Sequence, residues 1–137
     1  MILSDIDILA RTVFGEARGE SIEGKKAVAR VILNRFAAKY MGDTITGVCL
    51  RPWQFSCWNE NDPNSKVIKD ITLASPSFRV CVRAALDAVD DHFSGKPDPT
   101  HGSKHYFVKE MARPPSWAKN HTPVAVIGSH VFFNDIK

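Results

Sequence analysis

Residues 13–20, VFGEARGE, decide the fold of this chain because they end one helical pattern and lead into the next. Before them, apolar residues recur at spacings of three and four, at Ile6, Leu9 and Val13, which is typical of a helix with one buried face. Glu16 is the next residue of this stripe. The sequence therefore predicts a first helix that directs an acidic side chain toward the core.

Gly19 is a natural residue to follow the C-terminus of this helix, so Glu16 should lie in the last turn. The negative end of the helix dipole and partial desolvation both disfavour an ionised carboxylate there. Such an acid can keep its proton near neutral pH, which a general acid for a glycosidic oxygen requires. The pattern fits equally well an ordinary helix-end acid paired with Arg18, Lys25 or Lys26.

The composition is that of one ordinary globular domain, which we place at residues 1–137. Hydrophobic residues make up 44% of the chain and charged residues 24%. The formal net charge of +3 is compatible with an acidic polymer as substrate but is too small to indicate nucleic-acid binding. We expect a monomer.

The cysteines and the N-terminus indicate in which cellular compartment the chain is made. Cys49, Cys57 and Cys81 form an odd set without a CxxC pair, so we expect reduced, partly buried thiols rather than a Cys49–Cys57 disulfide. The N-terminus lacks a basic segment followed by a long apolar one, and no other run is long enough to span a membrane. These features predict synthesis in the cytoplasm without a signal peptide, and no stable membrane association.

A central second helix is predicted after the Glu16 turn. Ser21 can cap it, and its inward stripe over residues 27–36 is strongly apolar. Asn34 and Arg35 at its end are expected to hydrogen-bond to neighbouring loops rather than to act on substrate.

Further helices are predicted over residues 45–50, 65–73 and from Ser75-Pro76 to near Gly95. Between the first two, aromatic and polar residues alternate over residues 51–58, which indicates an extended segment. In this segment Gln54 and Ser56 would share one face, opposite Trp53, Phe55 and Cys57.

The last part of the chain predicts a small antiparallel sheet. Residues 104–108 and 124–127 are expected strands, and Gly128-Ser129 suits a two-residue hairpin turn into a strand at 130–133. The fold class is therefore α+β, with a helical body, a small antiparallel β-sheet and a substrate groove between them.

Five separate motifs resemble the SleB-like, spore cortex-lytic type of cell-wall hydrolase. They are GEARGE at 15–20, EG at 23–24, AVARVILNR at 27–35, QFSC at 54–57 and IGSHVFF at 127–133. The resemblance implies a lysozyme-like fold and cleavage of the glycan strand of peptidoglycan between N-acetylmuramic acid and N-acetylglucosamine. It also implies that Glu16 is the catalytic acid, with no cofactor and no metal.

Spore members of that family carry a secretion signal and often a separate wall-binding domain, and this sequence shows neither. By resemblance we expect a phage endolysin with bacteriolytic, antimicrobial activity. It would reach the bacterial cell wall through a holin-type membrane lesion.

One catalytic carboxylate suits a lytic transglycosylase, because the 6-hydroxyl of the sugar can attack and no second acid or water is needed. Ordinary glycosidases use two carboxylates. The alternative is therefore a hydrolytic muramidase in which Glu20 or Glu23 supplies the second one.

Substrate-binding roles are expected for seven residues: Glu20, Gln54, Phe55, Ser56, Tyr106, Trp117 and His130. Gln54 and Ser56 would hydrogen-bond N-acetyl groups, and Trp117 would stack on a sugar, with Trp58 a weaker candidate. For each of these residues a purely structural role is the competing interpretation.

Two other function classes are weaker. A zinc N-acetylmuramoyl-L-alanine amidase could use His101 and His105, but these lie around a loop and no HExxH motif accompanies them. The chain could instead be a non-catalytic wall-binding module. It would then have no lytic activity, and a Glu16 substitution would change none.

Overall fold

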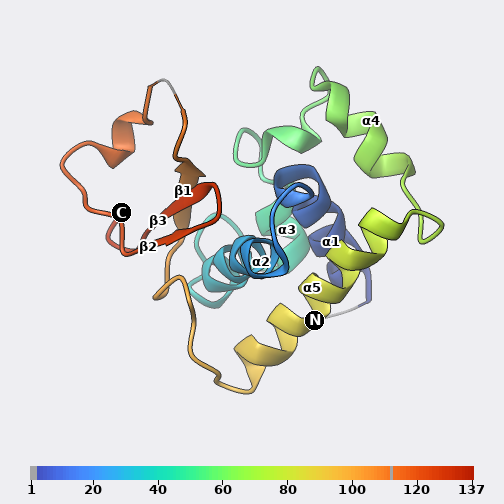
Figure 1. Cartoon of the computed structure of the whole chain (residues 1–137), viewed down its shortest axis with the longest axis horizontal. Coiled ribbons are helices and arrows are strands. Elements are labelled where there is room, and N and C mark those ends of the chain that lie inside the picture. The colour runs from blue at the N-terminus through green and yellow to red at the C-terminus, as the bar shows by residue number, and fades with distance from the viewer. Residues whose placement is uncertain (1–2, 112) are drawn as a thin grey trace.

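The computed structural model describes residues 3–111 and 113–137. The α-helices come first and the strands last, as the sequence predicts (Figure 1). The helices are α1 (Leu3–Ala17), α2 (Ile22–Ala37), α3 (Ile45–Leu50), the short 3-10 helix η1 (Ser56–Trp58), α4 (Pro63–Asp70), α5 (Pro76–Phe93) and a second 3-10 helix η2 (Ser116–Ala118). The strands are β1 (His105–Val108), β2 (Ala125–Ile127) and β3 (His130–Phe133).

Helix α2 is the centre of the fold, and it lies in Figure 1 between the other helices and the sheet. It packs on α1, α3 and α5 on one side and contacts β2 on the other. Its run from Ala27 to Leu33 is fully or almost fully buried, so the prediction of a central helix is confirmed. Ser21 caps it by accepting a hydrogen bond from the Gly24 N–H at 3.2 Å, as predicted.

The sheet is antiparallel in the order β1-β3-β2, so the last strand in the sequence lies in the middle. The Gly128-Ser129 turn joins β2 to β3, which confirms the predicted hairpin. The loop that leads from α5 to the sheet is fixed by Asp98, whose carboxylate accepts hydrogen bonds from Thr100, Gly102 and Asn34 at 2.8 to 2.9 Å.

The predicted extended segment at residues 51–58 is wrong. Gln54 N–H donates to the Arg51 carbonyl at 3.2 Å, which closes a tight turn, and η1 follows directly. Pro52 occupies the second position of this turn and Trp53 the third, with a φ of 68°, as a type II turn requires. The turn leaves Trp53 81% exposed, so it does not share a face with Phe55 and Cys57, which are buried.

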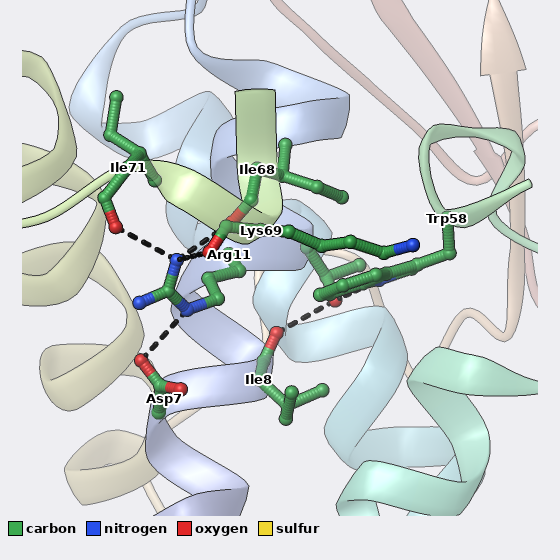
Figure 2. Close-up of polar contacts among 8 residues, drawn as sticks. Asp7, Ile8, Arg11, Trp58, Ile68, Lys69 and Ile71 are labelled. Carbon is green, nitrogen blue, oxygen red and sulfur yellow. Dashed lines mark hydrogen bonds and ion pairs between the residues drawn. The ribbon is translucent and has the colours of Figure 1, made fainter. Parts of the chain in front are cut away.

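Helix α4 ends earlier than predicted, at Asp70, and Arg11 of α1 holds that end (Figure 2). Its Nη1 donates to the carbonyl oxygens of Ile68 at 2.7 Å and Ile71 at 2.8 Å, while its Nε contacts Asp7 at 3.0 Å. A cation at the C-terminal end of a helix satisfies free carbonyl groups and opposes the helix dipole.

Trp58 holds η1 against α1 in the same region. Its indole Nε1 donates to Thr12 Oγ1 at 2.9 Å, and Thr12 donates in turn to the Ile8 carbonyl (Figure 2). This bond gives Trp58 a structural role in holding η1 on α1.

The cysteine prediction is confirmed, since Cys49, Cys57 and Cys81 are free and buried. Within the described residues, no helix is long and apolar enough to cross a lipid bilayer.

Arg11→Ala should lower the free energy of unfolding by about 1–3 kcal/mol, because carbonyl groups at the end of α4 lose a charged donor. Chemical denaturation followed by circular dichroism measures this. Lys66→Ala is the control: it removes the exposed Lys66–Asp70 pair of the same helix and should change the value by less than about 0.5 kcal/mol. Equal effects of both substitutions would contradict the capping role of Arg11.

Candidate functional site

Glu16 lies in the last turn of α1, half-buried, as the apolar stripe of that helix predicts. The Tyr106 hydroxyl, on β1, donates a hydrogen bond to Glu16 Oε1 at 2.8 Å. The Cys57 thiol, on η1, makes a second side-chain hydrogen bond to the carboxyl group. The acid is therefore held from three separate elements of the fold.

A groove with a volume of about 510 Å³ opens at Glu16. The residues that line it come from α1, α2, the 51–58 segment, β1 with the loop after it, and β3. They are Gly15, Glu16, Arg35, Gln54, Phe55, Ser56, Tyr106, Phe107, Val108, Glu110, Met111 and His130. The groove thus lies between the helical body and the sheet, where the sequence predicts it.

Burial raises the pKa of Glu16, and the negative charge of Asp62 adds to this effect. Hydrogen bonds from Tyr106 and Cys57 and the positive charge of Arg35 act in the opposite direction without cancelling it. A carboxylic acid in this environment retains its proton to higher pH than an exposed glutamate does. This is the property expected of a general acid.

Five of the seven predicted substrate-binding residues line the groove: Gln54, Phe55, Ser56, Tyr106 and His130. Phe55 is buried, Gln54 is half-buried and Ser56 is exposed, so the two polar side chains remain accessible beside Glu16. The tight turn thus brings these residues to the groove, although they do not lie on an extended segment.

His130 packs edge-on against Tyr106, with ring centroids 4.9 Å apart. Burial lowers its pKa, and its Nδ1 has no hydrogen-bond partner among the described residues. Burial thus favours the uncharged form of the His130 ring against the opposing charges of Glu20 and Glu110, and the ring packs on Tyr106 beside Glu16.

Glu20 is not among the residues that line the groove. Its Oε1 accepts a hydrogen bond from the Ser129 backbone N–H at 2.8 Å, which lowers the pKa of this carboxyl. A Cβ atom added at Gly128 would lie 2.4 Å from the same oxygen, so the hairpin turn fits closely over it. The structure gives Glu20 the role of holding the β2-β3 turn to the start of α2, and its contact with substrate stays a prediction.

Trp117 is also absent from the groove lining. It packs in an aromatic cluster with His105, Phe107 and Phe133, at centroid distances of 5.1 to 5.9 Å. Phe107 belongs to the groove lining, so Trp117 supports that wall from behind. The packing of Trp117 could not be predicted from the sequence, because the residues of a loop do not show whether it is exposed or packs against strands.

The two histidines of the amidase alternative lie in different surroundings. His105 packs on Tyr40 and Trp117, and burial, with the charges of Arg35 and Lys104, lowers its pKa to about 4. His101 is exposed in the preceding loop. Among residues 3–111 and 113–137, no group of three or more His, Cys, Asp or Glu side chains could hold a metal ion.

Three site residues were missed from the sequence. Cys57 was placed on the wrong side of an extended segment, and Glu110 lies in a loop without a recognisable pattern. Arg35 was assigned to loop contacts, and it does donate from Nε to the Lys104 carbonyl at 2.7 Å. It also lines the groove, and the only available signal was a cation at the end of a buried helical face.

Comparison with known proteins agrees with this geometry. The protein family described as Cell Wall Hydrolase matches residues 19–133. The chain belongs to this family. It is 32% identical over 131 residues to the spore cortex-lytic enzyme of Halalkalibacterium halodurans and 31% identical over 129 residues to that of Bacillus subtilis. These alignments cover 96% and 94% of this chain but only 35% and 37% of the relatives, so the cell wall hydrolase chain spans about a third of their length.

Two solved structures share the fold. The catalytic domain of the germination-specific lytic transglycosylase SleB from Bacillus anthracis superposes with a TM-score of 0.73 at 29% identity. The alignment covers 97% of this chain and 96% of that domain. The catalytic domain of the Bacillus cereus SleB protein gives a TM-score of 0.76, also at 29% identity, with 91% of its length covered. The predicted lysozyme-like α+β fold is confirmed by these likenesses.

Gly15→Ala should damage both the fold and the site of this member of the family. An added Cβ would lie 2.7 Å from Cys57 Cβ and Sγ and 3.3 Å from Ile68 Cγ2, so η1 would have to move away from Glu16. We expect a loss of about 1–3 kcal/mol in unfolding free energy. Gly19→Ala is the matched control, because nothing lies within 4 Å of its added Cβ. A stable Gly15→Ala protein would show that the packing here is looser than described.

Glu16→Gln should change the pH dependence of stability. Because the pKa of Glu16 is raised in the folded state, the wild type loses stability as pH rises from the unfolded value through the folded one. Glutamine cannot ionise, so it avoids this loss and can still accept the Tyr106 hydrogen bond. The melting temperature of the variant relative to wild type should rise between pH 4 and pH 8 in thermal unfolding. A pH-independent difference would contradict the raised pKa.

Proposed function

We propose that this chain cleaves the glycan strand of peptidoglycan between N-acetylmuramic acid and N-acetylglucosamine, as a lytic transglycosylase with Glu16 as its general acid and base. The observation that carries the proposal is the Glu16 carboxyl, held by Tyr106 on the floor of a groove and inclined by burial to keep its proton. The likeness to a domain described as that of a lytic transglycosylase supports the same reaction.

The proposed reaction needs one carboxyl group. Glu16 donates its proton to the glycosidic oxygen as the bond from that oxygen to C1 of N-acetylmuramic acid breaks. The 6-hydroxyl oxygen of the same sugar then bonds to C1, and its proton passes to the Glu16 carboxylate. The products are a 1,6-anhydro sugar end and a free hydroxyl end, with no water consumed and Glu16 restored.

The positions of Glu20 and Glu23 support the one-carboxylate mechanism. Glu20 is bound to the Ser129 backbone, and Glu23 borders a separate cavity with Lys26 and Arg30. Neither residue that was expected to supply a second carboxylate lines the groove. Glu110 does line it, so Glu110 is the second acid for the alternative hydrolytic muramidase.

Substrate contacts are proposed for the accessible polar groups beside Glu16. Gln54 and Ser56 can exchange hydrogen bonds with N-acetyl groups, and the Tyr106 and His130 rings present flat surfaces to a sugar. A groove volume of about 510 Å³ is within the usual range of ligand sites, so the groove can hold a short part of a glycan strand. The endolysin role, release through a membrane lesion and the monomeric state remain predictions.

Glu16→Gln should lower the rate of peptidoglycan cleavage by at least about 100-fold, the scale expected for loss of a general acid. Turbidity loss of purified cell walls measures the rate, and circular dichroism verifies the fold. Glu23→Gln is the control: this exposed acid lies outside the groove, so the variant should retain wild-type activity.

Mass spectrometry of the soluble fragments identifies the reaction. Muramic acid ends that are lighter by one water than reducing ends establish transglycosylation. Reducing ends would indicate hydrolysis with Glu110 as the second acid, and free stem peptides would overturn the glycosidase proposal. Full activity of Glu16→Gln would remove Glu16 from the mechanism.

A further inference from the structure

Arg35 is an unusual cation for its position near the end of α2. It is only 5% exposed, and its guanidinium lies over the Phe55 ring at 5.2 Å from the ring centroid. Nε donates to the Lys104 carbonyl, but Nη1 is buried with no hydrogen-bond acceptor among the described residues. A buried cation with an unused donor is costly unless a negative charge compensates it.

The position of Arg35 suggests where that negative charge forms. Arg35 and Glu16 line the same groove, and the charge of Arg35 acts on both Glu16 and Tyr106. While Glu16 holds its proton, the pair carries one net positive charge. When the proton leaves, a carboxylate appears close to a cation in a poorly solvated site, where such attraction is strong.

Arg30 on the same helix provides an internal comparison. It is 7% exposed, donates from Nη2 to the Lys96 carbonyl at 3.0 Å, and also has an unpartnered nitrogen, Nε. Arg30, however, borders a different cavity, beside Lys26 and Asp91. Both arginines are buried and donate to a backbone carbonyl, but only Arg35 borders the groove of Glu16 and acts on its pKa.

We propose that Arg35 is a positioning residue for glycan cleavage: its buried guanidinium is the counter-charge for the Glu16 carboxylate that forms when the proton passes to the glycosidic oxygen. This inference rests on the proposed function of Glu16. In this role Arg35 stabilises the ionised Glu16 carboxylate and does not contact the sugar.

The inference has a pH signature. The charged and titratable groups that act on Glu16 are Tyr106 from β1, Cys57 from η1, Asp62 before α4 and Arg35 from α2. Glu110 after β1 and His130 of β3 line the same groove, and burial favours the uncharged form of His130. Of these, Arg35 is the cation, and its charge lowers the pKa of Glu16. Without that charge the pKa of Glu16 rises further, so Glu16 keeps its proton to higher pH. The alkaline limb of the activity profile, where a general acid loses its proton, then moves to higher pH.

The experiment compares neutral variants of the two arginines. Arg35→Met and Arg35→Gln should lose about 100-fold in kcat/KM on solubilised glycan strands, on the scale of other preorganised charges, and their alkaline limbs should lie above that of wild type. Arg35→Lys, which keeps the positive charge, should restore the limb toward the wild-type pH. Arg30→Met disturbs the same helix but should leave the limb unchanged.

A measurement on the native protein covers the case in which the neutral variants do not fold. In a pH titration followed by NMR, the Arg35 Nε–H resonance should shift with the same midpoint as the 13C-labelled Glu16 carboxyl. The shift should be absent in Glu16→Gln, and the Arg30 Nε–H resonance should not follow it.

The outcomes separate this inference from the proposed function. If Glu16→Gln is inactive but the alkaline limb is unmoved in folded Arg35→Met or Arg35→Gln, Arg35 is only a structural residue. The same conclusion follows if the Arg35 Nε–H resonance does not shift as Glu16 titrates. If Glu16→Gln retains activity, the proposed function itself fails.

Discussion

The hydrogen bond from Tyr106 to Glu16 is the interaction on which the rest of the site depends. It joins residues 90 positions apart in the sequence and connects the first helix of the helical body to the first strand of the sheet. Glu16 can lie half-buried because its helix directs it inward, but it needs polar partners there. Tyr106 from the sheet and Cys57 from η1 supply them, and the groove lies where these elements meet.

Side-chain to backbone contacts hold the sheet in the position that this bond requires. Glu20 binds the β2-β3 turn, Asp98 organises the loop before β1, and Asn34 and Arg35 of α2 bind the same loop region. All of these contacts originate in or next to α2, or reach it. The buried central helix therefore sets the distance between the helical body and the sheet, and thus the shape of the groove.

The sequence predicts the elements whose signals are local. The cap at Ser21, the helix start at Ser75-Pro76 and the hairpin at Gly128-Ser129 are found as predicted, because each depends on residues within one turn. It failed at residues 51–58, where alternation of aromatic and polar residues is the same for a strand and for a tight turn followed by a 3-10 helix.

The roles of individual site residues were harder to predict, because burial alone does not say which cavity a side chain borders. Glu20 and Trp117 have the residue types of substrate contacts but are used to hold backbone and strands. Arg35 has the type of a loop anchor and borders the groove as well. Only the packing of α2 against both layers distinguishes these cases.

The strand order has a consequence for the time at which the site forms during synthesis. β1, which carries Tyr106, pairs with β3, and β3 is the last strand to leave the ribosome. Until it emerges, β1 lacks its neighbour and Tyr106 has no sheet to fix it beside Glu16. A nascent chain can therefore complete its helical body first, and the groove is assembled only after β3 has been made.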